Sequence, residues 1–414
     1  MLINPASSRL RATTIAIDEV GNLADFLRVG DQAFFHGNEG FVALGEVARC
    51  ETDSIDEANR WWIEMIDSIE NDTEMPGRFG TGPIGIGSFL FDPDHSSQRS
   101  VLIIPEIIIG RRQGQSWITQ IGYDQVTPIL PERSAMPSRC EQVEFSNGSV
   151  SETEWKAIVA ECIERIKAGE ARKVVLARDL IARSSTPIDL RSILRWLRDS
   201  YGSCWNYLVD GLVGSTPEML IRRESGLTTS RILAGTIPRI DGVDDIQQAS
   251  RLMGSVKDLQ EHRLAVESVV DRIRDHLQAM HVADAPFVLT LPNVMHLATD
   301  LCGISSPEVT TLSLAGAVHP SAAVCGLPTD KAREIIASLE KMDRGRYSGI
   351  VGWLDAQGDG EWALALRCGY IDADDPCTMR IFAGGGIVAN SDPHAELVET
   401  EAKMGPMRSA LRSA

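Results

Sequence analysis

Residues 381–403 read IFAGGGIVANSDPHAELVETEAK, an apolar strand with three successive glycines followed by a helix with carboxylates on one face. Because glycine has no Cβ, a ligand can approach the backbone N–H groups of this strand closely. Asp392 suits the N-cap position and Pro393 suits the first helical position, which predicts a helix running towards Met407. This strand, turn and helix are suited to binding an anionic ligand together with a cation.

Two pairs of carboxylates are candidates for the cation site. Glu396 and Glu399 share a face of the predicted C-terminal helix, where Lys403 can pair with Glu399 or reach a ligand carboxylate. Asp258 and Glu261 are also three residues apart, in the segment GSVKDLQEH. If the two helices face each other, the four carboxylates need a divalent cation between them, and Mg²⁺ prefers such oxygen ligands. With 58 acidic residues in the chain, a solvated acidic face is the competing explanation.

Composition limits the kinds of protein that this chain can be. It has 414 residues, of which 43% are hydrophobic and 24% charged, values typical of soluble globular proteins. The net charge of -18 argues against nucleic acid or an anionic membrane as a partner. The best apolar run, residues 101–109, is broken by Pro105 and is far shorter than the ~20 residues of a spanning helix. Eight cysteines without a CxxC pair, and no secretory apolar segment, predict reduced thiols and a cytoplasmic location.

Strand-like segments dominate the chain. The first 150 residues alternate short apolar strands with turns and contain one predicted helix near residues 56–69. Residues 140–153 are polar, contain an Asn-Gly-Ser turn signal and are the best candidate boundary. A helix over residues 154–168 leads into a strand at 173–178. Further strands are predicted at 100–109, 214–222, 231–236, 348–354, 361–371 and 378–388, with the longest helix at 245–280. The pattern favours an α+β chain with antiparallel sheets.

An ordered series of motifs resembles the chorismate-utilising enzymes. This group includes isochorismate synthase, salicylate synthase and the large subunits of anthranilate and aminodeoxychorismate synthases, and the resemblance is closest to isochorismate synthase. The resemblance covers residues 150–414, and its joint order is specific although each motif alone is weak. The motifs are KVVLAR (173–178), STPEMLIR (215–222), LAGTIPR (233–239), SVKDLQEH (255–262), HLAT (296–299), HPSAAVCGLP (319–328), DRGRYSGIVGW (343–353), GEWALALR (360–367), AGGGIVANSDP (383–393) and ELVETEAK (396–403).

The resemblance implies a fold in which two large antiparallel sheets pack together with helices outside. Residues 1–150 would be the N-terminal part of this fold and residues 151–414 the chorismate-binding catalytic region, within one structural domain. It also implies that chorismate is the substrate and that the protein is a monomer.

The reaction that the resemblance implies needs a base and an acid. Isomerisation of chorismate adds water at C2 while the C4 hydroxyl departs. Lys173 matches the position of the base and must be partly neutral to serve, which burial would favour. Glu218 matches the position of the general acid and must be protonated, so we expect its pKa to be raised by apolar neighbours or nearby carboxylates. Without the resemblance, both would be read as ordinary surface charges.

The remaining site residues carry over from the family by position. Glu261 and Glu399 match direct magnesium ligands, with Asp258 and Glu396 as outer-shell partners that orient water. The other matches are to substrate-binding positions: Gly235 and Thr236 for the ring carboxylate, Arg367, Gly384 and Lys403 for the enolpyruvyl carboxylate, and His296 near the ring. An arginine suits carboxylate binding because its guanidinium can donate two parallel hydrogen bonds. A structural, hydrogen-bonded histidine explains His296 equally well.

Three branches of the family are distinguished by a few positions. The aminating members have a glutamine where this chain has Lys173, so no glutamine amidotransferase partner is expected. Ala323 and Val324 match the small apolar positions of dedicated isochorismate synthases, whereas relatives with lyase activity tend to have a threonine in place of Ala323. Thr236 is shared with the lyases, so salicylate synthase stays an alternative, as does a non-catalytic binding subunit. The sequence leaves open whether the product serves menaquinone or siderophore synthesis.

Overall fold

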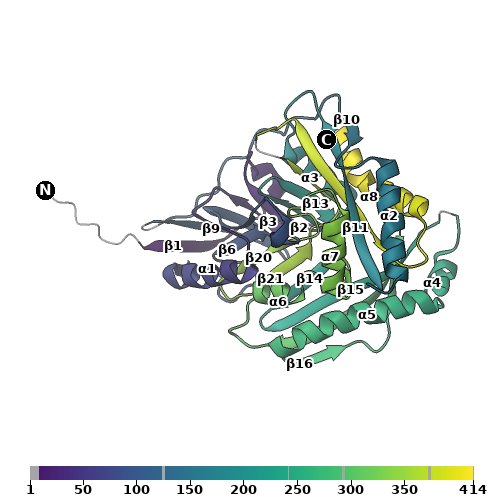
Figure 1. The fold of residues 1–414 in the computed structure, drawn as a ribbon. Helices are drawn as coiled ribbons and strands as arrows, with labels where there is room; N and C mark the ends of the chain where they lie inside the picture. Colours follow the sequence, from purple (N-terminus) through teal and green to yellow (C-terminus); the bar gives the residue numbers. More distant parts are fainter. Residues whose placement is uncertain (1–8, 124–125, 241, 291–293, 372–373, 414) are drawn as a thin grey trace.

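The computed structural model describes residues 9–123, 126–240, 242–290, 294–371 and 374–413, which contain two large β-sheets (Figure 1). Neighbouring strands run antiparallel, except that β1 and β5 are parallel. Sheet A is ordered β10 (Glu144–Asn147), β11 (Lys173–Arg183), β23 (Thr378–Ile387), β22 (Cys368–Ile371), β13 (Leu212–Thr216), β12 (Trp205–Val209), β2 (Gln32–His36), β3 (Glu39–Leu44), β8 (Ile107–Arg112), β9 (Gln115–Tyr123), β1 (Leu10–Ile17), β5 (Glu70–Thr73), with β19 (Gly326–Leu327) beside β11.

The second sheet, sheet B, lies against sheet A. It is ordered β16 (Leu277–Val282), β18 (Val294–Ser305), β15 (Leu227–Pro238), β14 (Met219–Glu224), β21 (Gly360–Leu364), β20 (Ile350–Asp355), β6 (Ile84–Ser88), β7 (Ser100–Ile104), β4 (Ala48–Thr52), with β17 (Phe287–Thr290) beside β18. Both sheets take strands from before and after residue 150, and β10, inside the polar segment 140–153, pairs with β11.

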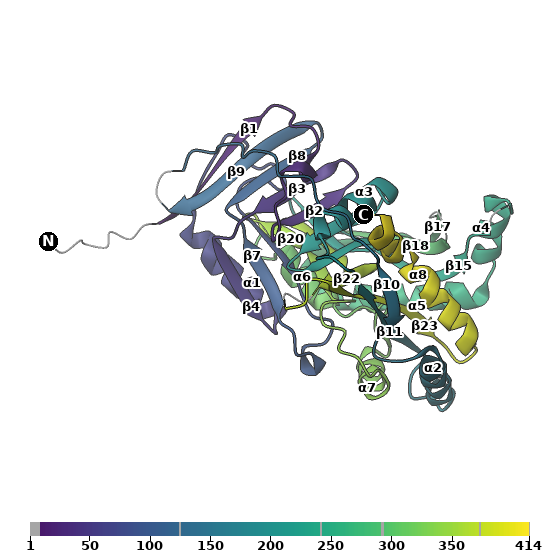
Figure 2. The ribbon, with the colours of Figure 1, turned by 90° about the horizontal axis from the view of Figure 1, so that it is seen from above.

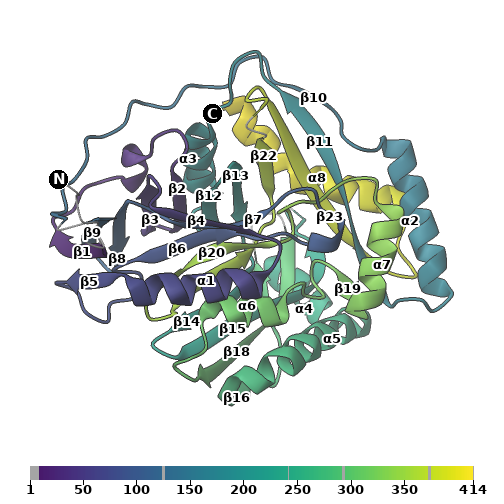
Figure 3. The ribbon, with the colours of Figure 1, turned by 60° about the vertical axis from the view of Figure 1, so that its left-hand side comes forward.

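Helices cover the outer faces of the two sheets (Figures 2 and 3). The helices over sheet B are α1 (Ile55–Ser68), α5 (Val256–Ile273) and α6 (Thr311–Val318). Those against sheet A are α2 (Glu152–Lys167), α3 (Leu190–Ser200), α7 (Thr329–Leu339) and α8 (Pro393–Ser413), while α4 (Asp245–Met253) packs near the ends of β15, β17 and β18. The α+β class and the packed sheets predicted from the sequence are confirmed.

The main core lies between the two sheets. Phe41 of β3 meets Trp353 of β20 edge to face, with ring centroids 5.5 Å apart, a geometry that aromatic pairs prefer. A second core on the outer face of sheet A joins Leu197 of α3 and Met404 of α8 to the strands beneath them. Packed side chains therefore fill the space between the sheets and the space beneath α3 and α8.

The C-terminal helix begins as the sequence predicts. The backbone N–H of Ala395 donates to Asp392 Oδ1 at 2.8 Å, so Asp392 satisfies a free donor of the first turn, and α8 starts at Pro393. The helix continues to Ser413, further than the predicted end near Met407.

The predicted helix over residues 245–280 is wrong. It is two helices, α4 and α5, followed by strand β16, which pairs with β18. The break occurs at Gly254 and Ser255, where the Ser255 side chain accepts a hydrogen bond from the Asp258 N–H at 3.3 Å and starts a new helix. Val256, in the first turn of α5, is 79% exposed, so the apolar residues of this segment do not form one continuous buried face.

Three predicted single strands are each divided between the sheets. Residues 214–222 leave sheet A at β13 and enter sheet B at β14, and residues 361–371 make the reverse change from β21 to β22. Residues 100–109 likewise divide into β7 and β8. An apolar run has the same local pattern whether or not it changes sheets, so these breaks were missed. Two of the crossings place Glu218 and Arg367 at the junction of the sheets.

Candidate active site

A cavity of about 270 Å³ lies where the two sheets cross, and every site residue predicted from the sequence lines it. The lining residues come from β11, β15, β18, β23, α5, α8, the two crossings and the loops that contain Val324 and Tyr347. These residues are Lys173, Glu218, Gly235, Thr236, Asp258, Glu261, His296, Ala323, Val324, Arg367, Gly384, Glu396, Glu399 and Lys403. The structure therefore brings together the whole predicted set, while the role of each residue stays a prediction.

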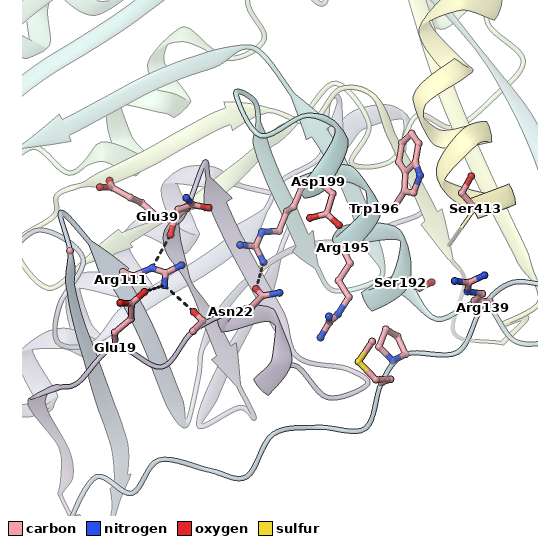
Figure 4. Close-up of a pocket in the computed structure, with 16 residues that line it drawn as sticks. Glu19, Asn22, Glu39, Arg111, Arg139, Ser192, Arg195, Trp196, Asp199 and Ser413 are labelled. Atoms are coloured by element: carbon pink, nitrogen blue, oxygen red, sulfur yellow. Dashed lines mark hydrogen bonds and ion pairs between the residues drawn. The ribbon is translucent and has the colours of Figure 1, made fainter.

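A larger surface hollow of about 800 Å³, drawn in Figure 4, shares no lining residue with this cavity. Its arginines are largely engaged by neighbouring groups: Arg111 pairs with Glu19 at 3.4 Å, and Arg195 pairs with Asp25 at 2.7 Å. None of the predicted site residues lines it. The smaller cavity is therefore the candidate active site.

Lys173 and Glu261 are joined across the cavity. Lys173 Nζ lies 2.8 Å from Glu261 Oε1, and both side chains are mostly buried, with 12% and 23% exposed. Burial alone would raise the pKa of Glu261, but the charge and hydrogen bond of Lys173 outweigh it and lower that pKa, with help from the Gly235 N–H. The role of Lys173 as the base stays a prediction.

Glu218 stands at the crossing from β13 to β14. Its backbone carbonyl accepts a hydrogen bond from the Leu364 N–H at 3.0 Å, which ties it to the neighbouring crossing strand. Burial raises the pKa of Glu218 to about 7, although Lys173, Lys403 and Arg367 act in the opposite direction. The direction agrees with the sequence-based expectation. At neutral pH a large fraction of this side chain is therefore protonated and able to donate a proton.

Arg367 lies on the other crossing, between β21 and β22. Its backbone has φ 49°, in the left-handed region that non-glycine residues seldom adopt, and its carbonyl accepts from the Ser215 N–H at 3.3 Å. Within the described part of the chain, its guanidinium has no hydrogen bond or ion pair. Burial lowers the pKa of Arg367. An unpaired, largely buried guanidinium in a cavity favours an anionic ligand.

The carboxylates of α8 lie close to the glycines of β23. Lys403 Nζ is 2.7 Å from Glu399 Oε1 and donates to the Gly384 carbonyl at 2.8 Å. A Cβ at Gly385 would stand 2.9 Å from Glu396 Oε2. The glycine at this position therefore lets the helix carboxylates approach the strand.

The carboxylate set has the chemistry of a hard-cation site. Glu396 Oε2 is buried without a hydrogen-bond partner, and burial, with the nearby Glu399 charge, raises the pKa of Glu396. Such an orphaned oxygen gains a partner when a cation or its water binds. In the described residues, no three His, Cys, Asp or Glu side chains already form a closed metal-binding cluster. The donors are carboxylate oxygens, the ligand type that Mg²⁺ prefers.

His296 and Thr236 form a hydrogen-bonded pair at the cavity wall. His296 Nδ1 lies 2.8 Å from Thr236 Oγ1. Burial, reinforced by Arg367 and Lys403, lowers the pKa of His296 to about 4, so the ring is neutral at physiological pH. Gly235, beside Thr236, has φ 75° in a β-bulge of the β15–β18 pairing. The bulge turns this part of β15 towards α5.

Comparison with known proteins now identifies the family. A family model described as chorismate binding enzyme matches residues 7–412. The chain belongs to this family. Isochorismate synthase DhbC of Bacillus subtilis is 38% identical over 271 residues, covering 62% of this chain and 67% of the relative. Isochorismate synthase EntC of Escherichia coli K12 is 32% identical over 333 residues, covering 78% and 80%. The structure of MenF, the menaquinone-specific isochorismate synthase of Escherichia coli, matches with TM-score 0.77 and 26% identity over 97% of this chain and 94% of that one.

This member of the chorismate-binding family also has cavity residues that sequence reasoning missed. Tyr347 stacks on Phe382 with ring centroids 5.0 Å apart, and burial raises the pKa of Tyr347 to about 12, so it stays a phenol. Lys257 also lines the cavity. Both residues stand inside motifs quoted for the resemblance, Tyr347 in DRGRYSGIVGW and Lys257 beside Asp258 in SVKDLQEH, and those motifs were the available signal. Within the described residues, no helix is both long and apolar enough to cross a membrane.

Proposed function

We propose that this protein is an isochorismate synthase that isomerises chorismate to isochorismate. The names of the relatives DhbC and EntC support the proposal. The observation that carries it is the convergence of Lys173, Glu218 and Arg367 with two carboxylate pairs on one cavity. An amine, a protonated carboxyl group and an anion-binding wall are the groups that this reaction needs.

Lys173 and Glu218 divide the proton transfers between them. Lys173 takes a proton from the water that attacks C2 of the ring, and Glu218 gives a proton to the departing C4 hydroxyl, so that water is both consumed and released. The raised pKa of Glu218 supports its role as the acid, because a carboxyl group that is ionised at neutral pH has no proton to give.

The charged walls of the cavity orient the substrate. Arg367 and Lys403 bind the enolpyruvyl carboxylate, with the Gly384 backbone between them. Gly235 and Thr236 hold the ring carboxylate, and neutral His296 keeps Thr236 in place through their hydrogen bond. These contacts fix the ring between the base and the acid, which converts a bimolecular attack into a positioned one.

Glu261 and Glu399 would hold Mg²⁺ directly, with Asp258 and Glu396 orienting its water. The bound metal would neutralise the ring carboxylate. The orphaned Oε2 of Glu396 supports this assignment. One relative named above is menaquinone-specific, whereas the names of DhbC and EntC, of the same activity, state no pathway. The proposed product of this protein is therefore isochorismate, without an assigned pathway.

The test is incubation of purified protein with chorismate and Mg²⁺, followed by chromatographic separation and a pyruvate assay. We expect isochorismate without stoichiometric pyruvate, lost on addition of EDTA. Equal amounts of salicylate and pyruvate would assign the chain to the salicylate synthase branch. Absence of turnover in the presence of Mg²⁺ would contradict the proposal.

A further inference from the structure

The strand that carries Lys173 has an interrupted edge. On one side β11 pairs continuously with β23. On the other side it pairs with β19 at Lys173 and Val174, the Val175 N–H donates to the Cys325 carbonyl at 2.8 Å, and pairing with β10 begins only at Leu180. Two backbone groups in the gap are bound by side chains instead. The Val175 carbonyl accepts from Arg344 Nη2 at 2.6 Å, and the Ala177 N–H donates to Glu340 Oε1 at 2.6 Å.

Arg344 also reaches the facing wall of the cavity. Its Nη1 donates to the Val324 carbonyl at 3.1 Å, while Nε and Nη2 bind the two oxygens of Glu340 at 2.8 Å and 2.6 Å. Both Val175 and Val324 line the cavity. One guanidinium thus joins the Lys173 strand to the segment containing Ala323 and Val324.

The Arg344–Glu340 pair is costly to bury, which makes its presence informative. Each side chain is only 4% exposed. Removing two charges from water is costly, and an apolar pair of similar volume is often equally stable. The attraction between the two charges is therefore not required for stability, although the same side chains also satisfy the Val175 and Val324 carbonyls and the Ala177 N–H. What an apolar pair lacks is a planar set of donors that fixes two carbonyls and a carboxylate at once.

We propose that Arg344 and Glu340 are positioning residues that hold the Ala323–Val324 wall at a fixed distance from Lys173. The inference rests on the proposed function, because the wall matters as the surface against which the substrate ring packs. Neither side chain lines the candidate active site, so both act through the residues that they hold.

The test replaces the pair with apolar residues, as Arg344→Met with Glu340→Leu. Removing only Arg344 would leave a buried carboxylate unpaired and threaten folding, which the double variant avoids. A matched control is Arg223→Met with Asp359→Leu, because this buried ion pair lines no part of the cavity. Arg344→Lys is the conservative variant, which keeps the charge but not the fork of donors.

We expect the double variant to fold but to melt at a lower temperature than the wild type, because the Val175 and Val324 carbonyls and the Ala177 N–H lose their side-chain partners. Its kcat/KM for chorismate should fall roughly 100-fold, the cost of about 1 Å of misplacement, and Arg344→Lys should recover part of this loss. Amide hydrogen exchange should become faster at residues 174–178 and 321–327, a readout that needs no turnover. The control double variant, Arg223→Met with Asp359→Leu, should leave kcat/KM and the hydrogen exchange of these two segments unchanged.

Two results would overturn the inference: unchanged kinetics in a folded double variant of an active wild type, or unchanged exchange in the two segments. A wild-type protein without turnover would instead count against the proposed function, and the exchange measurement would still decide the positioning role.

Discussion

Lys173 Nζ and Glu261 Oε1 lie 2.8 Å apart, so the proposed base and a proposed metal ligand are in direct contact. The pair connects β11 of sheet A with α5, which packs on sheet B. The charge state of the amine and the arrangement of the carboxylates are therefore coupled. Changes at either residue should alter catalysis, and removal of one partner should also lower stability, because the other charge is left mostly buried without its pair.

Replacing Lys173 with alanine should reduce kcat by a factor of ~10²–10⁴, the usual contribution of a general base. The measurement is the initial rate of isochorismate formation with Mg²⁺ present. Lys167→Ala, which removes a surface lysine paired with Glu164, is the control and should leave the rate unchanged. A Lys173→Ala variant that keeps more than a tenth of the wild-type rate would remove Lys173 from the role of base.

Glu218→Gln should lower kcat by a similar factor, because the amide cannot donate a proton to the departing hydroxyl. For the wild type, the acid is active while protonated, so the rate should fall as the pH rises through about 7, the pKa of Glu218. A pH–rate profile of both proteins provides the measurement. If the high-pH limb persisted unchanged in Glu218→Gln, another group would be the acid.

The same carboxyl group should affect stability in a pH-dependent way. Its pKa is raised in the folded state, so the folded protein binds more protons than the unfolded chain between about 4.5 and 7, and stability falls as the pH rises through this window. Glu218→Gln removes this pH-dependent loss of stability, because the amide does not ionise. The variant should therefore melt at a higher temperature than the wild type at pH 8 and at a similar temperature at pH 4.5. If the melting temperatures of variant and wild type differed by the same amount at pH 8 and at pH 4.5, burial would not be the cause of the raised pKa of Glu218.

Metal binding can be measured separately from turnover. Glu261→Gln and Glu399→Gln should each weaken Mg²⁺ binding, seen by calorimetry, by at least about tenfold, because each removes a charged oxygen ligand. Glu396→Gln should have a smaller effect, in keeping with an outer-shell role. Glu267→Gln, on the exposed face of α5, serves as the control. Equal binding in all four variants would place the metal elsewhere.

Arg367→Lys should raise KM for chorismate and lower kcat/KM by about tenfold or more, since an ammonium cannot reproduce a two-pronged carboxylate contact. The guanidinium has no partner within the described residues, so its loss should not break an internal ion pair. Circular dichroism checks the fold. A variant with wild-type KM would show that this arginine does not bind substrate.

Much of the local structure was predictable from the sequence. The Asp392 and Pro393 signals gave the start of α8 correctly, and the apolar run after Lys173 gave β11, because caps and alternation depend only on neighbouring residues. The residues of the candidate site were found through the ordered motifs of the resemblance. Periodicity failed at residues 245–280, because the Ser255 cap interrupts the helix without disturbing the spacing of the apolar residues.

The sequence by itself determined which side chains are available and which short elements carry them, since those features are set by local chemistry. Tertiary structure decided where strands change sheets, and so placed Glu218 and Arg367 at the junction. It also decided that Arg344 completes the edge of β11. These outcomes depend on backbone groups and carboxylates that meet across long stretches of chain, and a local pattern of residues contains no information about which of them will meet.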